Sequence, residues 1–343
     1  MTIEKRLFGH TKHGCEVDCY RLENGGIAVE VLTYGGTIRS LTVPAPGGAR
    51  DVVLGFDDMA GYEAQEGYIG ATIGRVGNRI GGAHFILKGT SYAVDANDGP
   101  NCLHGGFRGF DKQVWEARLE TDALALSLLS PDMDCGFPGN LNVEVRYSLI
   151  SDALSIGYTA ECDADTPVSL TNHCYFNLGG HGSGSIGAHT IQILAEAITQ
   201  VDGMLIPTGE LLDIADTPFD LSKPTIIGSG LSDSHPQIAA GNGYDHNFVL
   251  SHTPRRSLMP VAVLYYSGLT MACLTTQPGL QFYSGNHLSG ASGKGGSIYS
   301  KHSGLCLETQ AWPDAVNHPG FPDCVLKKGE TYRHKTMYAF KQD

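Results

Sequence analysis

Short apolar runs recur along the whole chain, and clusters of Gly, Pro, Asp and Asn separate them. Runs of this length, bounded by turn-forming residues, are typical of β-strands. We expect a hairpin turn at Ser151–Asp152, where two such runs almost meet. The predicted strands are IAVEVLT (27–33), TIRSLTV (37–43), AHFILKGTSYAV (83–94), LALSLLS (124–130), LNVEVRYSLI (141–150), LSIGYTAEC (154–162), VSLTNHCYFNL (168–178), LTMACLTTQ (269–277), GLCLETQ (304–310) and TMYAF (336–340).

Helical periodicity is almost absent from the chain. The best candidate is FDDMAGYEA (56–64), which is about two turns long and has Asp57 or Asp58 as a plausible N-cap. Many short strands without intervening helices indicate a β-sandwich or barrel and not a succession of βαβ units. No composition shift or internal repeat marks a boundary, so we expect one large all-β domain over residues 1–343.

Composition and charge narrow the class of protein. Only 17% of the 343 residues are charged, below the roughly 25% of an average domain, and 45 are glycine, which suits many tight turns. The net charge of −13 and the absence of a basic run disfavour a nucleic-acid or anionic-membrane partner. Nine cysteines without a framework spacing predict free thiols in a reducing compartment. The opening residues lack the apolar run of a signal peptide and no segment could span a bilayer, so we expect a cytoplasmic protein.

Several common catalytic motifs are missing. The chain has no GxxxxGK[ST] loop, GxSxG elbow or HExxH pair, and GRVGNRIGG lacks the spacing of a dinucleotide site. Fourteen histidines, among them His10 and His13, suggest a metal site at first. A zinc site needs three or four converging ligands, and no spacing in the chain supplies them. We therefore expect a reaction that needs neither a metal nor another cofactor.

Two segments place histidines in unusual contexts. In NCLHGGFRGF, His104 precedes two glycines that let a ligand approach the backbone closely, although it could equally be a solvated turn residue. In SLTNHCYFNL, strand alternation would put His173, Tyr175 and Asn177 on one face. That face is either a polar surface or a row of groups able to bond hydroxyls, and the residue types favour the second interpretation.

A carboxylate stands in a strand that otherwise looks buried. Glu308 follows Leu305-Cys306-Leu307 in GLCLETQ. Burial raises the pKa of a carboxyl group unless a partner compensates, and a tuned carboxylate is a candidate general base. The alternative is a structural ion pair with Arg or Lys.

Other polar positions are individually weaker. Arg75 and Arg79 in GRVGNRI could clamp a ligand or fix loops. Asp245 in GYDHNF could accept hydrogen bonds from sugar hydroxyls or close a turn. Gln277 in TTQPGLQFY stands just before a proline, at an expected strand end.

Taken together, these segments resemble the aldose 1-epimerase (galactose mutarotase) family over nearly the whole chain. NCLHGG, TNHCYFNL and LETQ are specific in combination, and Gly77 is a mild departure because the family more often has alanine there. The resemblance implies a large antiparallel β-supersandwich with few short helices. The matching segments, in order, are GRVGNRI, NCLHGGFRGFDKQVW, TNHCYFNL, IPTGE, YDHNF, QPGLQFYSGN, LETQAWPDAVNHPGFP and KKGETYRHKTMYAF.

The resemblance also implies catalytic roles. Glu308 would be the general base, His173 the general acid, and His104 would assist at the reacting end of the sugar. Interconverting α and β anomers requires removal of the C1 hydroxyl proton and protonation of the ring oxygen, which a carboxylate and an imidazolium perform together. The ring opens to the aldehyde, the C1–C2 bond rotates, and closure reverses both proton transfers.

Substrate contacts follow from the same motifs. Arg75, Asp245 and Gln277 would hold the hydroxyls of the sugar, and Asn78 and Tyr175 would line the site. The implied substrate is a free hexose such as D-galactose or D-glucose, bound by a monomer or weak homodimer. Two alternatives stay open: a hexose-6-phosphate 1-epimerase, which would want clustered Arg and Lys, and a non-catalytic carbohydrate-binding protein of the same fold.

Overall fold

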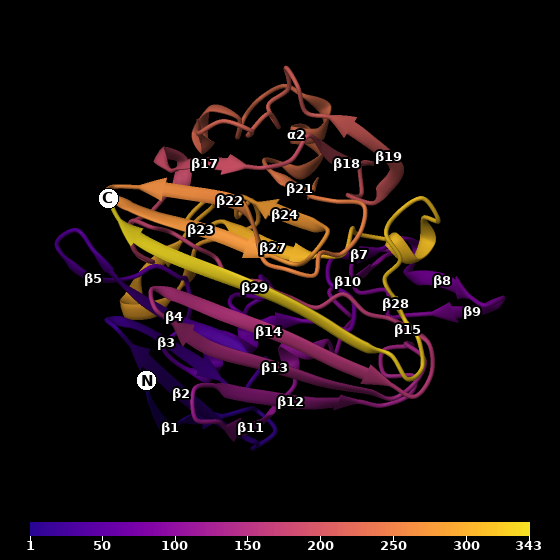
Figure 1. The fold of residues 1–343 in the computed structure, drawn as a ribbon, viewed down its shortest axis with the longest axis horizontal. Coiled ribbons are helices and arrows are strands. Elements are labelled where there is room, and N and C mark those ends of the chain that lie inside the picture. Colours follow the sequence, from indigo (N-terminus) through magenta and orange to yellow (C-terminus); the bar gives the residue numbers. More distant parts are fainter.

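The computed structural model describes residues 1–343, which form antiparallel sheets with very little helix (Figure 1). The largest sheet has nine strands in the order β11-β12-β13-β14-β29-β23-β22-β17-β20. Its strands are β11 (Glu116–Leu119), β12 (Leu124–Ser130), β13 (Leu141–Ile150), β14 (Ala153–Cys162), β29 (Thr331–Gln342), β23 (Leu269–Thr275), β22 (Met259–Tyr266), β17 (Thr190–Ile193) and β20 (Thr225–Ile226).

Two five-stranded sheets complete the main framework. The first runs in chain order through β1 (Thr2–His10), β2 (Glu16–Asn24), β3 (Ile27–Leu32), β4 (Thr37–Ala45) and β5 (Gly48–Asp51). The second runs in the order β19 (Pro207–Asp213), β18 (Ala197–Val201), β21 (Asp245–Val249), β24 (Gly279–Tyr283) and β27 (Cys306–Gln310).

The remaining elements are short. Two-residue or four-residue strands pair as β6 (Thr72–Ile73) with β16 (Thr171–Asn172), β7 (Arg79–Ile80) with β10 (Cys102–Leu103), β8 (His84–Leu87) with β9 (Thr90–Ala93), β15 (Thr166–Pro167) with β28 (Val325–Leu326), and β25 (Ala291–Ser292) with β26 (Ile298–Tyr299). The helices are α1 (Met59–Ala64) and α2 (Pro236–Gly241). At six residues each, neither helix approaches the length and apolarity that crossing a membrane requires.

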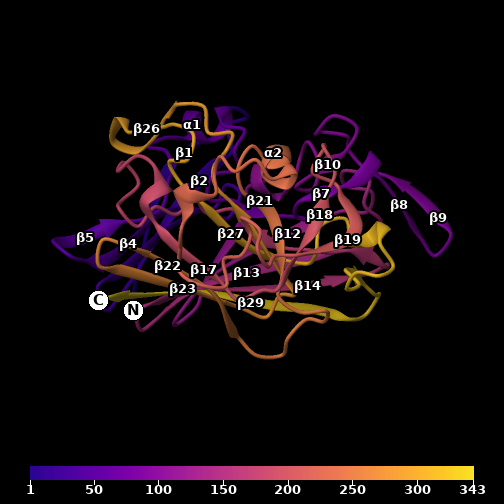
Figure 2. The same ribbon diagram turned by 90° about the horizontal axis from the view of Figure 1, so that it is seen from above.

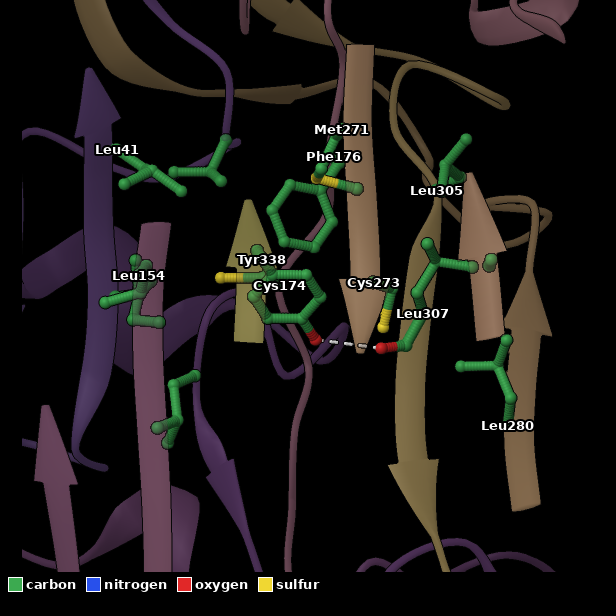
Figure 3. Close-up of a cluster of buried hydrophobic side chains, with 14 of the residues drawn as sticks. Leu41, Leu154, Cys174, Phe176, Met271, Cys273, Leu280, Leu305, Leu307 and Tyr338 are labelled. Carbon is green, nitrogen blue, oxygen red and sulfur yellow. Dashed lines mark hydrogen bonds between the residues drawn. The ribbon is translucent and has the colours of Figure 1, made fainter. Parts of the chain in front are cut away.

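The sheets enclose one main hydrophobic core of 56 buried residues. Figure 1 looks onto the nine-stranded sheet, and in Figure 2 its strands β22, β23 and β29 lie along one side of the molecule with both helices toward the other. Figure 3 shows where the layers meet: Phe176, Met271 and Leu307 pack around Tyr338, whose hydroxyl donates to the Leu307 carbonyl at 2.9 Å. This bond joins β29 of the nine-stranded sheet to β27 of the second five-stranded sheet.

Most of the predicted strands are confirmed. The segments 124–130 and 141–150 match β12 and β13, and the hairpin turns at Ser151–Asp152 as expected. Asp58 caps α1 by accepting a hydrogen bond from the Gly61 amide at 2.9 Å.

Two predicted strands were wrong in extent. Residues 83–94 form a hairpin, β8 and β9, because the chain reverses at Lys88 and Gly89, both with positive φ. Of 168–178, only Thr171–Asn172 is a strand, because the following residues bond to loops, as His173 does with Ala71. The pattern also missed α2 and several strands whose apolar runs are short or interrupted.

We expect Tyr338→Phe to lower the free energy of unfolding by about 1 kcal/mol, because it leaves a buried carbonyl without its donor. Tyr265→Phe is the matched control, since Tyr265 is 43% exposed. Urea denaturation of both variants measures the difference. Equal midpoints for the two variants would show that the Tyr338 hydroxyl contributes nothing.

Candidate active site

A cavity of about 860 Å³ opens between the second five-stranded sheet and several loops. The sheet supplies Asp245, Tyr283 and Glu308 to its wall. The loops that close it supply the remaining polar groups, which are Glu63, Glu66, Tyr68, Asn78, Arg79, Asp98, His104, Asp111, Lys112, His173, Tyr175 and His287 among others. The size is that of an ordinary small-molecule site.

Strand register aligns the polar groups of the sheet. Asn247 on β21 lies opposite Gln281 on β24, and Gln281 lies opposite Glu308 on β27. Since alternate residues of a strand share a face, Asp245 and Tyr283 lie on the same side. The Gln281 amide donates to Asp245 Oδ1 at 2.7 Å, so two neighbouring strands fix each other's polar side chains.

Glu308 is a buried carboxyl group on a strand whose opposite face belongs to the core. Its neighbour Leu307 points into the apolar cluster of Figure 3, and Glu308 itself is 2% exposed. One oxygen, Oε2, has no hydrogen-bond partner within the protein. Burial, followed by the charge of Asp245, raises the pKa of Glu308 well above its usual value, and Arg79 acts in the opposite direction.

His173 faces Glu308 from the segment after β16. Its Nε2 lies 3.6 Å from Glu308 Oε1, and its backbone is held by Ala71 and Gly70 through two hydrogen bonds. On the other side of the ring, Nδ1 lies 3.4 Å from the thiol sulfur of Cys306. Burial lowers the pKa of His173 to about 4.

The environment of this pair favours the uncharged form of each group. A protonated Glu308 with a neutral His173 holds one proton in total, and so does an ionised Glu308 with a cationic His173. The two arrangements therefore differ only in where that proton lies. A ligand that hydrogen-bonds the charged forms shifts the proton toward His173.

His104 is held in one tautomer by Asn78. The Asn78 backbone N–H donates to His104 Nδ1 at 3.1 Å. The backbone N–H of His104 donates to the Asn78 carbonyl at 3.0 Å. Both residues have positive φ, 52° and 62°, a conformation that His and Asn adopt more readily than most side chains. Because Nδ1 accepts, the neutral ring carries its proton on Nε2 and offers a donor to the cavity.

The tautomer of His104 disfavours a metal centre at this site. Ligand atoms of His104, His173 and Glu308 lie within 4.8 Å of one another, which is a spacing that a divalent cation could bridge. Ligation through His104 Nε2 needs a free lone pair on that atom. The bond from Asn78 to Nδ1 leaves Nε2 protonated instead, so the donor set fits hydrogen bonding better than metal binding.

Arg79 and Tyr175 frame the cavity. The Arg79 Nε donates to Asp98 at 2.8 Å, and its side chain lines the cavity with 13% exposure. The Tyr175 hydroxyl donates to the Gly67 carbonyl at 2.9 Å, and its ring lies 5.1 Å from that of His173. Tyr175 thereby fixes one wall beside the imidazole.

The structure corrects the prediction for Arg75. Its guanidinium is 2% exposed and donates to four backbone carbonyls and two hydroxyls, away from the cavity lining. All of this hydrogen bonding ties loops together. The second arginine of GRVGNRI, Arg79, is the one that reaches the cavity.

The prediction for Gln277 was wrong for a similar reason. Its amide donates to the Tyr332 hydroxyl at 2.8 Å, and Gln277 does not line the cavity. Gln281, four residues later in the same motif, takes the place beside Asp245. Alternation in GLQFY opposite LETQ was the signal that could have identified it, because it pairs Gln281 with Glu308.

The other predicted residues come together. Glu308, His173, His104, Asn78, Tyr175 and Asp245 all line the one cavity. Asn177, expected beside Tyr175, instead bonds the Gly184 and Ser303 carbonyls. Sequence reasoning missed Tyr68, whose ring lies 4.5 Å from that of His104 and which no motif marks.

The segment after Glu308 supports the Arg79 loop. The Asp314 amide donates to the Arg79 carbonyl, and Asp314 Oδ1 accepts from the Gly81 amide at 3.1 Å. Asn317 donates to the same carboxyl group at 2.7 Å, and His318 Nε2 lies 3.3 Å from its Oδ2 atom. These residues, which the sequence left without a role, position the loop that carries Asn78 and Arg79.

Comparison with known proteins points in one direction. The family model "Aldose 1-epimerase" matches residues 18–339. The chain is 44% identical to the galactose mutarotase of Bos taurus over 343 residues, 99% of each chain. It is 39% identical to the aldose 1-epimerase of Escherichia coli K12, over 94% of this chain and 95% of that one. A crystal structure of galactose 1-epimerase from Lactobacillus acidophilus superposes with a TM-score of 0.87 at 26% identity, covering 100% and 99% of the two chains.

We expect His104 to be neutral with its proton on Nε2 at neutral pH, because burial lowers its pKa well below the usual value and Asn78 donates to Nδ1. Nitrogen-15 NMR of histidine-labelled protein distinguishes the tautomers by the shifts of the two ring nitrogens. A protonated Nδ1 would contradict the hydrogen bond from Asn78. Exposed His13 is an internal reference.

Proposed function

The chain belongs to the aldose 1-epimerase family and is an isomerase that acts on a free sugar, and we propose that the reaction takes place at the pair of Glu308 and His173. The observation that carries the proposal is the 3.6 Å approach of a buried carboxyl group to a buried imidazole inside a small-molecule cavity. Anomer exchange needs one group that accepts a proton and one that donates a proton, and a carboxyl group beside an imidazole can supply both.

In the proposed reaction Glu308 removes the proton of the C1 hydroxyl while His173 protonates the ring oxygen. The C1–O5 bond breaks and the aldehyde forms. Rotation about C1–C2 presents the other face, and ring closure returns the proton on the new C1 hydroxyl from Glu308 and takes the ring-oxygen proton back to His173. Both groups end as they began, so the reaction balances without a cofactor.

The surrounding groups suit a hydroxylated ring. His104 Nε2 would donate to the oxygen at the reacting end, where charge develops. Asp245 and Gln281, already bonded to each other, would accept from and donate to hydroxyls at the other end. We propose Arg79 in place of Arg75, with Asn78 and Tyr175 as lining residues.

The charges of the cavity argue against a phosphorylated substrate. Six carboxyl groups line it, namely Glu63, Glu66, Asp98, Asp111, Asp245 and Glu308. Its only Lys and Arg are Arg79 and Lys112, and both pair with an aspartate. A phosphate would meet net negative charge there, which disfavours a hexose-6-phosphate 1-epimerase. A purely sugar-binding protein would have no need of the His173–Glu308 pair.

The preferred substrates, the oligomeric state and the cellular location are also proposals. We propose D-galactose and D-glucose as substrates, since relatives named galactose mutarotase are 43–44% identical to this chain. The chain would act as a single domain, as a monomer or weak homodimer. The cytoplasm suits its nine cysteines, none of which is paired.

Polarimetry on freshly dissolved α-D-galactose tests the function. Wild-type protein should speed the change of optical rotation above the buffer rate, and Glu308→Gln should reduce the catalysed rate about a hundred- to ten-thousandfold. An uncatalysed drift with wild-type protein, for every common aldose, would refute the activity. Near-normal turnover in Glu308→Gln would remove Glu308 from the mechanism.

The same variant should be more stable than wild type by about 1 kcal/mol at neutral pH. The raised pKa of folded Glu308 gives stability that is complete below the unfolded pKa of about 4.3 and is lost as the pH rises toward the folded value. Thermal melts at acidic and neutral pH should therefore converge at the acidic end. A difference that does not depend on pH would show another cause.

A matched pair of variants tests the corrected arginine. Arg79→Ala should raise KM about tenfold or more, because it removes a donor facing the sugar. Arg75→Met should lower the free energy of unfolding by about 3 kcal/mol or more, because several buried carbonyls lose their donor, and should leave KM of the folded protein unchanged. A stable Arg75 variant with raised KM would restore Arg75 as the substrate ligand.

A further inference from the structure

Tyr68 lines the catalytic cavity in a backbone conformation that aromatic residues rarely adopt. Its φ is 54°, in the left-handed region, where a bulky side chain is held only if the surrounding structure enforces the conformation. Its hydroxyl forms no hydrogen bond within the protein, so the ring makes the contacts of this side chain. Residues held in such conformations cluster at functional sites, which makes Tyr68 a candidate for a role in the cavity.

The backbone around Tyr68 is joined to the segment that carries His173. The Ala71 amide donates to the Tyr68 carbonyl at 3.0 Å, and the His173 amide donates to the Ala71 carbonyl at 2.9 Å. On the residue before Tyr68, the Gly67 carbonyl accepts from the Tyr175 hydroxyl at 2.9 Å. Tyr68 is therefore fixed on both sides by the segment of His173 and Tyr175, which enforces its positive φ.

The ring of Tyr68 forms a cluster with the two histidines. Its centroid lies 4.5 Å from that of His104, at an interplanar angle of 60°, and 5.9 Å from that of His173. The two imidazoles lie 5.2 Å from each other. The Lys112 Nζ atom lies 5.6 Å from the Tyr68 centroid, within reach of a cation–π interaction. Since 4.5 Å is at the short end of aromatic pair distances, Tyr68 packs against His104 more closely than His173 does.

The imidazole of His104 is held by two contacts of different kinds. The Asn78 backbone N–H donates to its Nδ1 atom, and the Tyr68 ring packs against the imidazole ring. The first contact requires Nδ1 to be unprotonated, because a protonated ring nitrogen cannot accept a hydrogen bond. Water that reached the imidazole would stabilise its cationic form, which breaks the bond from Asn78. An aromatic cover on the imidazole therefore protects its attachment to Asn78.

Burial matters more to His104 than the charges around it. The titratable groups that face it are Tyr68, Arg79, Lys112, His173 and Glu308, whose carboxyl oxygen lies within 4.8 Å of a His104 ring nitrogen. The cations among them oppose a further positive charge, and an ionised Glu308 favours it. Burial is the largest cause of the lowered pKa of His104. The groups that exclude water from the ring thus set its protonation state.

From the enforced backbone, the short ring contact and the bond from Asn78, we propose that Tyr68 is a positioning residue that packs against His104 and shields its imidazole from water. The Tyr68 ring keeps Nδ1 free to accept from Asn78, so that the Nε2–H group keeps one direction during the reaction. The role belongs to the aromatic ring and not to the hydroxyl. The inference rests on the proposed function in giving His104 a part in catalysis, whereas the shielding itself does not depend on the roles of Glu308 and His173.

NMR titration of the histidine ring signals tests the shielding. In Tyr68→Gly, which removes the ring and suits the positive φ, the pKa of His104 should rise by about one unit or more, because water then solvates the cation. Tyr68→Phe keeps the ring and should leave that pKa unchanged. Tyr68→Asn also tolerates a positive φ and should behave like Tyr68→Gly, which separates loss of the ring from loosening of the loop by glycine. The signal of His104 is the one that disappears in His104→Gln.

Phe107→Ala is the matched control. Phe107 lines the same cavity three residues after His104, but it is 60% exposed and its ring contacts neither histidine. This variant also removes an aromatic ring from the cavity lining. It should leave the titration of His104 unchanged.

The catalytic rate should follow the titration. We expect Tyr68→Gly to lower kcat/KM for D-galactose about tenfold at neutral pH, because His104 is no longer held in one orientation. The acidic limb of the pH profile should move to higher pH, because His104 then gains its proton, and loses the bond from Asn78, at a higher pH. Tyr68→Phe should match wild type in both respects. A merely structural role would lower the yield of folded protein without moving this limb.

Three results would each overturn the proposal. These are an unchanged pKa of His104 in both Tyr68→Gly and Tyr68→Asn, an equal shift in Phe107→Ala, and a shift in Tyr68→Phe as large as that in Tyr68→Gly. All three concern the titration of His104 and need no turnover. A failure of the shielding is therefore distinguishable from a failure of the proposed reaction.

Discussion

The whole site depends on keeping a carboxyl group out of water. Glu308 stands on a strand whose next side chain, Leu307, belongs to the main core, so the sheet that builds the core also sets the position of this carboxyl group. His173 Nε2 approaches the carboxyl group to 3.6 Å and gives it a polar neighbour in this buried position. Burial of Glu308 lowers the stability of the fold, and the packing of the surrounding core compensates for this loss.

Two hollows of the molecule differ in the sign of their charge. Carboxyl groups gather around His173 and Glu308, where they suit hydroxyl donors, and cations without an ion-pair partner gather in a second hollow beside β14 and β29. The average composition of the chain, which is acidic throughout, conceals this separation.

The sequence predicted the fold well where alternation is regular and poorly where strands are short. It identified β12, β13 and the cap of α1, whose signals are local. Glu308, His173 and His104, which it singled out by motif, line one cavity. In two motifs that each contain two candidates, it chose the arginine and the glutamine that lie outside this cavity. The sequence of the motif does not show which of Arg75 and Arg79 faces the cavity. Only the contacts of the folded chain show that carbonyls surround Arg75. Tyr68 lies in no motif, and its contact with His104 exists only in the folded chain.

The register of Asn247, Gln281 and Glu308 has a consequence for assembly of the protein. A slip of one residue between these strands would turn the polar row toward the core and bring Leu280 and Leu307 to the cavity side. A misregistered molecule would therefore be inactive and poorly packed at once. The average catalytic rate per molecule would therefore report the fraction of molecules in which these strands pair in the correct register.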